Sequence, residues 1–170
     1  VSSDNINICG DKGFLGRSTN GGLNWSANSS GFYGNLNDIK FFDQNTGIAS
    51  GIYGSGIILR TTNAGLQWDT TTIDANEALG IYIYDENIAY VGGTGKIFKT
   101  TNKGASFTSY NTQSTPYWYD VSFPNENTGY VVSKYRVVDK TTDGGNTWVN
   151  ILPSSAQGYF TISFINGSTG

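Results

Sequence analysis

Short runs in which apolar and polar residues alternate follow one another along the chain, separated by clusters of Gly, Asn, Asp and Ser. The clearest succession has its runs at residues 37–42, 48–51, 57–62 and 67–73. Alternation with a period of two is typical of half-buried β-strands, whereas the clusters are typical of tight turns. The pattern therefore predicts four short antiparallel strands within this stretch, and no run predicts a long amphipathic helix.

This order of runs and turns recurs with a period of about 40 residues. The first run of the stretch has counterparts at residues 80–83, 120–123 and 161–164. Four strands per period form one blade of a β-propeller, whereas a β-solenoid would lack the hairpin turns and an immunoglobulin-like sandwich would not repeat itself. We therefore predict an all-β fold, a β-propeller segment of about four blades of four antiparallel strands. The expected repeats cover residues 1–35, 36–77, 78–117 and 118–158, and residues 159–170 begin a further blade.

Each repeat carries one copy of a short box, Ser/Thr-x-Asn/Asp-x-Gly-x-x-aromatic. Its Asx residues are Asn20, Asn63, Asn102 and Asp143, and its aromatic residues are Trp25, Trp68, Phe107 and Trp148. The Asx side chain can accept hydrogen bonds from backbone N–H groups of its own turn, and the glycine permits a positive φ. The aromatic side chain can fill space between neighbouring sheets. We expect a structural role for all eight residues, and a cost of about 3–5 kcal/mol for the loss of a fully buried aromatic side chain.

The box resembles the Asp box of bacterial neuraminidase repeats. The longer frame from Asp120 to Trp148 resembles the repeats of photosystem II assembly-factor-like propellers, which also occur in secreted bacterial proteins. The resemblance covers essentially the whole chain, although Asn replaces Asp in three boxes and Phe107 replaces Trp in one. It implies a β-propeller fold in which the box is structural and lies away from the substrate site.

Composition excludes several kinds of chemistry. The chain has no histidine and a single cysteine, Cys9, so it holds neither a Ser-His-Asp nor a Cys-His catalytic set and no ligand set for zinc, haem or an iron–sulfur cluster. We expect no metal and no cofactor. The formal net charge is −3, the ten Lys and Arg residues are scattered, and no apolar run could span a bilayer. Nucleic acid and membrane insertion are therefore not expected.

The two ends of the chain leave two alternatives open. Residues 1–10 align with residues 83–92, so the first repeat begins at the end of its first strand. A four-bladed ring could be completed by the run at 161–164, or the chain could be a segment of a larger propeller. Uncovered sheet faces are a liability that whole domains avoid, which favours the larger propeller and makes further blades of the same parent protein expected partners.

Aromatic and acidic residues gather near the starts of the first strands. The candidate ligand-binding residues are Phe32, Tyr33, Asp38, Tyr117, Trp118, Asp120 and Tyr159. Aromatic faces beside Asn and Asp suit a sugar ring. In the alternative interpretation, simple alternation points Tyr119 and Phe160 into the core, and the other aromatic residues are scattered over the surface.

Asp38 and Asp120 occupy equivalent positions, and a glycosidase uses two carboxyl groups. Gly80 and Thr161 stand at the same position elsewhere, which favours ordinary turn chemistry. A sialidase-like site would need convergent arginines, but Arg17 and Arg60 share one repeat phase with Lys99 and Lys140. We expect these cations to lie on solvated strands or to cap hairpins.

Together these features predict a non-enzymatic β-propeller scaffold of a secreted or cell-surface bacterial protein, located outside the cell or on its surface. Its expected role is interaction or adhesion through a protein or a surface glycan. The alternative is a carbohydrate-active, glycosidase- or sialidase-like propeller whose catalytic residues lie largely outside this segment. Chaperone-like binding of a membrane-protein partner is a third, weaker hypothesis, taken from the resemblance.

Overall fold

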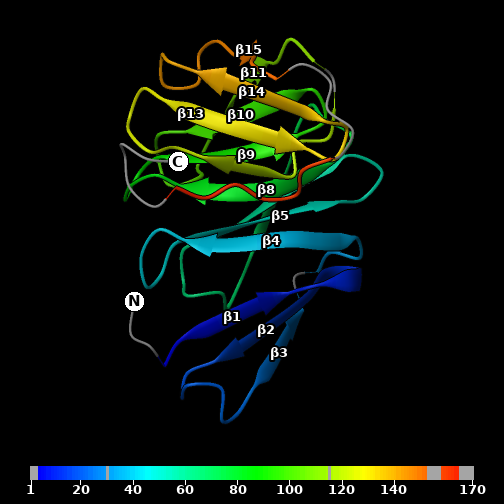
Figure 1. The fold of residues 1–170 in the computed structure, drawn as a ribbon. Coiled ribbons are helices and arrows are strands. Elements are labelled where there is room, and N and C mark those ends of the chain that lie inside the picture. Colours follow the sequence, from blue (N-terminus) through cyan, green and yellow to red (C-terminus); the bar gives the residue numbers. More distant parts are fainter. Residues whose placement is uncertain (1–3, 30, 115, 153–157, 165–170) are drawn as a thin grey trace.

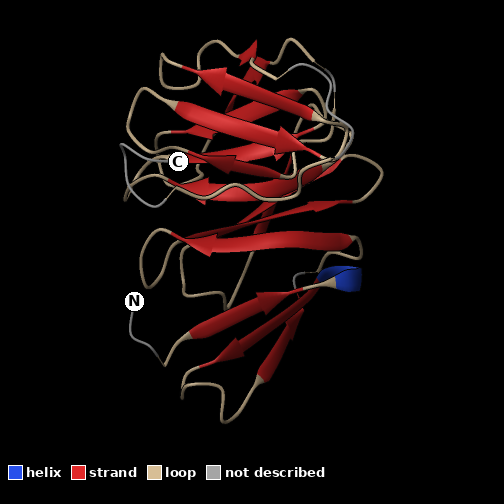
Figure 2. Cartoon of the chain, viewed as in Figure 1, coloured by secondary structure: helices blue, strands red, loops and turns tan. Residues whose placement is uncertain are grey.

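The computed structural model describes residues 4–29, 31–114, 116–152 and 158–164, which form β-strands and one 3-10 turn, η1 (Asp11–Gly13) (Figures 1 and 2). The strands are β1 (Ile6–Cys9), β2 (Phe14–Ser18), β3 (Ser26–Ser29), β4 (Asn35–Phe41), β5 (Gly47–Ile52), β6 (Gly56–Thr61), β7 (Asp69–Thr72), β8 (Ala78–Ile83), β9 (Ala89–Gly93), β10 (Lys96–Thr100), β11 (Thr108–Asn111), β12 (Asp120–Ser122), β13 (Gly129–Ser133), β14 (Val137–Thr141) and β15 (Val149–Asn150). Among the residues described, no helix has the length and apolar character needed to cross a membrane.

Strands that are neighbours in the sequence pair antiparallel in separate sheets. The first sheet contains β1, β2 and β3, and three four-stranded sheets contain β4–β7, β8–β11 and β12–β15. We call these sheets blades 1 to 4. Figure 1 shows them stacked from blade 1 at one end to blade 4 at the other. The predicted all-β fold of antiparallel blades is confirmed, with three strands rather than four in the described part of blade 1.

The core consists of apolar layers between successive blades. Between blades 2 and 3, Ile48 and Ile58 pack with Ile81 and Phe98. Between blades 3 and 4, the cluster includes Tyr90, Ile97, Val121, Phe123 and Trp148. Because each layer joins two sheets, burial of apolar surface holds every blade to its neighbour.

A β-bulge interrupts the first strands of blades 2 and 3. The register shifts between Leu36 and Asp38 in β4 and between Ala78 and Ile81 in β8. An extra residue of this kind breaks strict alternation.

The corresponding segment of blade 4 breaks alternation in the same way. Trp118 and Val121 are both buried although they are three residues apart. Tyr119 is half-buried and Phe160 is 65% exposed, so the expectation that alternation points these two side chains into the core is wrong. Trp118 is the core residue instead.

All four boxes fold into the same hairpin turn. In blade 2, Gln67 N donates to Asn63 Oδ1 at 2.9 Å, and Gly65 N donates to Thr61 Oγ1 at 3.0 Å. The Asx oxygen and the Ser or Thr oxygen accept the equivalent bonds in blades 1, 3 and 4. The indole of each box tryptophan donates to its box glycine carbonyl, as Trp148 does to Gly145 at 3.0 Å. The box therefore closes its own turn with side-chain hydrogen bonds.

The boxes of blades 2, 3 and 4 also rest on the blade before them, at a surface that we call the socket. A socket is a pair of residues that lie opposite each other on the two strands directly before the box. The second of these strands carries the Arg or Lys, and the first carries its partner. The sockets are Asn7 with Arg17 in blade 1, Ile48 with Arg60 in blade 2, Tyr90 with Lys99 in blade 3, and Tyr130 with Lys140 in blade 4. In this pairing Asn7 is equivalent to Tyr90. The alignment of residues 1–10 with residues 83–92, which placed Ile8 there, is therefore wrong by one residue.

Contacts between box and socket are close. A Cβ added to Gly145, the box glycine of blade 4, would lie 2.9 Å from the Tyr90 ring of blade 3. The Tyr90 hydroxyl donates to the Gly144 carbonyl at 3.0 Å, and Lys99 Nζ donates to the same carbonyl at 2.7 Å. Arg60 Nε likewise donates to the Lys103 carbonyl at 2.9 Å. In blades 2 and 3, therefore, the cation caps the hairpin of the following blade.

Candidate functional site

A cavity of about 450 Å³ lies where the first strands of neighbouring blades meet. Its lining comes from β4, β8, the segment that enters β12, and the C-terminal segment of residues 158–164. The lining residues are Asn37, Asp38, Lys40, Leu79, Gly80, Tyr119, Asp120, Phe160 and Thr161. Two of the candidate residues, Asp38 and Asp120, are thus brought to one cavity.

The Asp38 carboxylate links blade 2 to blade 3. Its Oδ1 accepts from the neighbouring Ile39 N at 2.7 Å, and its Oδ2 accepts from Ile81 N of blade 3 at 2.9 Å. Ile81 follows the bulge of β8, where the ladder is interrupted. The carboxylate therefore satisfies a backbone donor that the bulge would otherwise leave unpaired.

The Asp120 carboxylate repeats this arrangement two blades further along, between blade 4 and the C-terminal segment of residues 158–164. Its Oδ1 accepts from Val121 N at 2.9 Å, and its Oδ2 accepts from Ile162 N at 3.0 Å and from the Thr161 hydroxyl at 2.9 Å. Gly80 stands at the equivalent position in blade 3, where an added Cβ would lie 2.3 Å from the Tyr119 carbonyl oxygen. Close backbone approach thus replaces the carboxylate between blades 3 and 4.

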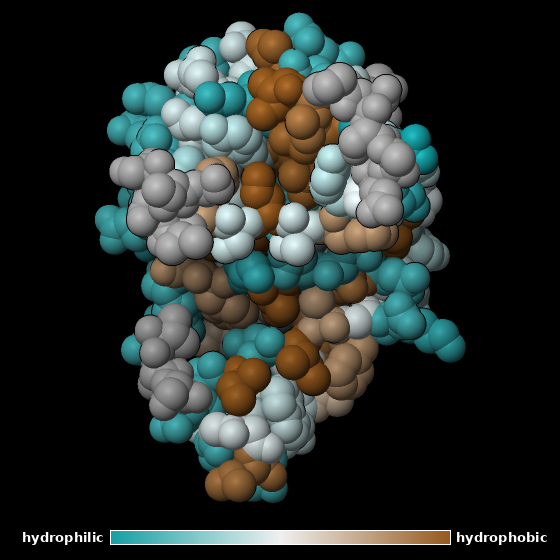
Figure 3. Space-filling view, in the orientation of Figure 1, coloured by the Kyte–Doolittle hydropathy of each residue, from teal (hydrophilic) through white to brown (hydrophobic). Residues whose placement is uncertain are grey.

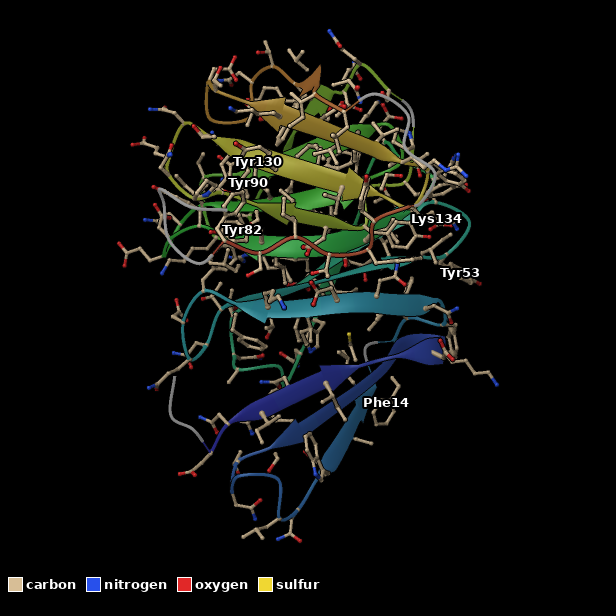
Figure 4. The ribbon with its side chains drawn as sticks, in the orientation of Figure 1. Phe14, Tyr53, Tyr82, Tyr90, Tyr130 and Lys134 are labelled. Carbon is tan, nitrogen blue, oxygen red and sulfur yellow. The ribbon has the colours of Figure 1, made fainter. Side chains whose placement is uncertain are left out.

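A lysine surrounded by tyrosines stands next to the cavity. Lys134, in the turn between β13 and β14, places Nζ 5.8, 5.4 and 5.3 Å from the ring centroids of Tyr117, Tyr119 and Tyr135. Hydrogen bonding to Tyr119 raises the pKa of Lys134 above its ordinary value, so the ammonium stays charged at neutral pH. Figure 4 shows Lys134 on the side of the blades opposite Tyr82, Tyr90 and Tyr130.

Tyr135 of this group and Phe160 of the cavity lining both face solvent. Tyr135 is 53% and Phe160 is 65% exposed, and Phe160 packs edge-on against Tyr119 with 5.5 Å between ring centroids. We call Tyr117, Tyr119, Lys134, Tyr135 and Phe160 the aromatic rim. It continues directly into the cavity, because Tyr119 and Phe160 belong to both.

The other candidate residues lie apart from the cavity lining. Phe32 is half-buried and packs edge-on against Tyr53, with 5.7 Å between centroids, and Tyr33 is 80% exposed. Tyr159 is half-buried, and its N–H donates to the Ser133 carbonyl at 3.0 Å.

Trp118 is wholly buried, and its indole donates to Thr112 Oγ1 at 3.1 Å. It offers no face to a sugar ring, so its assignment as a ligand-binding residue is corrected to a core residue.

Sequence reasoning missed Lys134 and Tyr135 as site residues. The signal was present in the repeat, because the equivalent turns contain Gly54 and Gly95, whereas blade 4 has Lys134-Tyr135-Arg136. Arg136 adopts a φ of 70°, a backbone conformation that favours glycine. This departure from the glycine-containing counterparts is the signal by which the turn could have been singled out from the sequence.

The described residues contain no group of three or more His, Cys, Asp or Glu side chains that could hold a metal ion. Burial raises the pKa of Cys9 to about 11, which keeps this thiol protonated and unreactive at neutral pH. Neither finding adds a reactive group to the cavity.

Comparison with known proteins identifies the fold. No protein-family model and no curated protein sequence matches the chain. An ancestral GH74 enzyme is 19% identical with a TM-score of 0.73, over 89% of this chain and 23% of the enzyme. YCF48 from Cyanidioschyzon merolae is 16% identical with a TM-score of 0.71, over 96% of this chain and 61% of that protein.

A third similar structure contains YCF48 bound to D1 peptide. It is 16% identical with a TM-score of 0.54, over 68% of this chain and 38% of that protein. GH74 enzymes and YCF48 are β-propellers, and the blades described above are blades of that fold. The chain spans less than two thirds of the length of each of these neighbours.

Proposed function

We propose that this chain is a non-enzymatic β-propeller scaffold that binds an extended segment of a partner protein at the aromatic rim. The observation that carries the proposal is the exposed, cation-bearing aromatic surface beside the 450 Å³ cavity. Tyrosine side chains supply large contact areas at low entropic cost and recur at the centres of protein interfaces. YCF48 with its bound D1 peptide is an example of a similar structure that takes a peptide.

The hydrogen bonds of Asp38 and Asp120 favour a non-enzymatic role. A glycosidase needs one carboxyl group to donate a proton and the other to act as base or nucleophile. Each carboxylate here accepts a bond from a backbone donor of its own strand and one from a backbone donor more than 40 residues further along the chain. Releasing either one for catalysis would break a contact between β4 and β8 or between β12 and the C-terminal segment.

The family of the repeats and the cellular location of the parent protein belong to the same proposal. We assign the repeats to the Asp-box and photosystem II assembly-factor-like class, which the shared hairpin hydrogen bonding of the four boxes supports, and we place the parent protein outside the cell or on its surface. Protease treatment of intact source cells tests the location, because a surface protein loses its immunoblot signal whereas an internal one keeps it.

Selection from a displayed library of random peptides tests the function. The variants Tyr135→Ala and Phe160→Ala remove exposed rings of the rim, and Tyr53→Ala is the matched control because Tyr53 is 64% exposed near the corresponding turn of blade 2. Peptides selected on the native chain should bind the rim variants at least about tenfold more weakly and the control unchanged. Equal binding to all three variants contradicts the proposal.

A glycan is the second candidate ligand, favoured by the exposed face of Phe160 beside the Asp120 carboxylate. The same variants on a glycan array separate the two ligand classes, since a glycan-binding rim gives glycan signals that Phe160→Ala abolishes and selects no peptide. Hydrolysis of a glycoside that Asp38→Asn abolishes would overturn the non-enzymatic assignment.

A further inference from the structure

The turn between β13 and β14 carries two cations that pair with no described acidic residue. Lys134 and Arg136 are both exposed, and neither takes part in the ion pairs of the described residues, which use Lys40, Lys96 and Lys103. The formal net charge of the chain is −3, so this turn is a local concentration of positive charge on an acidic protein. Such a surface attracts an oppositely charged partner and repels a cationic one.

The turn faces solvent for a reason that does not depend on the end of the chain. In blade 2 the corresponding turn, residues 53–55, carries Tyr53, which is 64% exposed although blade 3 packs against blade 2. Figure 4 shows Lys134 and Tyr53 on the same side of the blades. Turns at this side thus remain open to solvent with the next blade in place, and the exposure of Lys134 is a property of the turn.

Three tyrosine rings hold the Lys134 ammonium in place and leave its charge intact. Nζ lies between 5.3 and 5.8 Å from the ring centroids of Tyr117, Tyr119 and Tyr135. An aromatic face attracts a cation through its quadrupole and carries no net charge of its own. Because these contacts already restrict the lysine side chain, binding a ligand costs less rotamer entropy than it would for a free lysine. The turn therefore presents an ordered and charged hydrogen-bond donor.

The acidic residues of the neighbouring cavity are engaged elsewhere. Asp38 forms an ion pair with Lys40, with 3.4 Å between Oδ1 and Nζ. Asp120 Oδ2 accepts from Ile162 N and from the Thr161 hydroxyl. Neither carboxylate forms an ion pair with the cations of the turn. A carboxylate supplied by a ligand therefore meets no competitor from this cavity.

We propose that the partner segment bound at the aromatic rim is acidic, with an Asp or Glu side chain whose carboxylate accepts a hydrogen bond from Lys134 Nζ. This inference rests on the proposed function and adds the chemistry that the rim selects. Residues of the segment next to the acidic one contact the exposed rings of Tyr135 and Phe160, and Arg136 adds to the attraction. Figure 3 shows both apolar and hydrophilic residues at the surface over blade 4, as such a mixed segment requires.

Charge decides what the rim rejects as well as what it binds. A hydrogen bond between an ammonium and a carboxylate is about twice as strong as one between neutral groups. A glutamine in place of the acidic residue keeps the shape of the segment but loses the charge, and a lysine would face the like charges of Lys134 and Arg136. The difference in affinity between acidic, neutral and basic segments is therefore the measurable signature of this contact.

A cycle of substitutions in the chain and in the peptide tests the contact. Peptides selected on the native chain from a displayed random library should be enriched in Asp and Glu relative to the unselected library. Exchange of the enriched acidic residue for Gln or Asn should weaken binding about tenfold, the loss expected for one charge-assisted hydrogen bond. Lys134→Gln should weaken binding of the acidic peptide by the same factor and leave the neutral peptide unchanged, so that the difference between the two peptides disappears.

Two matched variants control for the fold and for the position of the charge. Lys134→Arg keeps the charge and should keep the preference for the acidic peptide. Lys12→Gln removes an exposed cation from the corresponding turn of blade 1 and should leave the preference unchanged. Circular dichroism and thermal unfolding of each variant verify that the blades are intact.

The outcomes separate this inference from the proposed function. Peptides that Tyr135→Ala weakens, but that bind equally well with Glu or Gln, overturn the acidic preference and leave a rim that binds peptides. A loss that Lys134→Gln causes equally for acidic and neutral peptides also overturns it, because the lysine then acts only through the rings. A library without any peptide that depends on Tyr135 overturns both proposals.

Discussion

The contact between blades 1 and 2 is looser than the contact between blades 3 and 4, although a copy of the same box motif makes each contact. In the second contact, Tyr90 stacks on Phe123 at 3.8 Å, and Trp148 is 3% exposed. In the first, Asn7 takes the place of Tyr90, and a cavity of about 260 Å³ lies between the blades. Arg17 Nε is buried there and meets no acceptor among the described residues.

This difference separates local from tertiary stabilisation. The hydrogen bonds within the box are nearly the same in both places, with 2.9 Å between the Asx oxygen and the N–H four residues later. What changes is the residue of the preceding blade under the box glycine. Each box thus folds by its own chemistry, and the socket decides how firmly the box is bound to the next sheet.

The largest expected effect comes from the box tryptophans. Trp148→Ala should lower the free energy of unfolding by about 3–5 kcal/mol, because it empties a buried site between blades 3 and 4. Trp25→Ala should cost only about 1–2 kcal/mol, because that side chain is half exposed. Urea unfolding at dilute protein measures both, and equal costs would contradict the assigned difference between the boxes.

A buried carboxylate in blade 4 provides the second test. Asp139 is fully buried on β14, where blade 2 has Leu59, and its Oδ2 meets no donor in the described part of the chain. Burial raises the pKa of Asp139 above its ordinary value. The folded state therefore holds this proton more tightly than the unfolded state, and the resulting stability is present at low pH and lost as pH rises through the folded-state pKa.

Asp139→Asn should therefore stabilise the fold at pH 7 by about 1–2 kcal/mol, or roughly 3–6 °C in Tm. The gain should shrink as pH falls through the raised folded-state pKa and be lost at about pH 4 and below, where the native carboxyl is protonated in both states. Thermal unfolding at pH 7 and pH 4 measures it, with Asp74→Asn on the exposed surface as control. A gain that does not depend on pH would exclude the ionised carboxylate as its cause.

The boxes also differ in backbone strain. Ala64 in blade 2 has a φ of 60°, whereas blade 4 has Gly144 with a φ of 70° at the same position. A left-handed conformation costs a non-glycine residue about 1 kcal/mol, so Ala64→Gly should stabilise the chain by up to that amount. Denaturant unfolding checks the gain, and Ala105→Gly, without the positive φ, should instead be neutral or destabilising.

The smallest expected effect concerns acid sensitivity. Although burial opposes it, hydrogen bonds from Thr147 and Thr141 hold the pKa of Asp143 at about 2. Its stabilising contribution is thus present above the ordinary pKa and lost as pH falls from about 4 to about 2. Asp143→Asn, which copies the other boxes, should change stability at pH 7 by only a few tenths of a kcal/mol and flatten the decline in acid. An unchanged acid profile would show that other carboxylates dominate it.

The blade pattern could be predicted from the sequence because it depends on local signals. Alternation, Gly and Asn turns and the Asx hydrogen bonds act within a few residues. The burial of Trp118 could not be predicted by alternation, because the segment entering β12 breaks alternation where β4 and β8 have their bulges. The exposure of Trp25 depends on which sheet lies under its box, which no property of the box itself encodes.

For the candidate site, the predicted residues were partly brought together. Asp38 and Asp120 share a cavity, but Asp38 binds a backbone N–H of β8, and Asp120 binds a hydroxyl and a backbone N–H of the C-terminal segment, all more than 40 residues away. Lys134 and Tyr135 were not predicted, because only a comparison of this turn with the equivalent turns of the other blades singles them out. Contacts between blades therefore set the limit of inference from single motifs.

Support for the box hairpins runs in one direction along the polypeptide. The box glycines of blades 2, 3 and 4 each contact the sheet made before them, and no sheet needs the box that comes after it to hold its own hairpin. During synthesis, each new unit can therefore dock on a surface that has already left the ribosome. A mutation that disrupts an early sheet therefore removes the surface on which the next box rests. A mutation that disrupts the last sheet leaves the contacts of the earlier boxes in place.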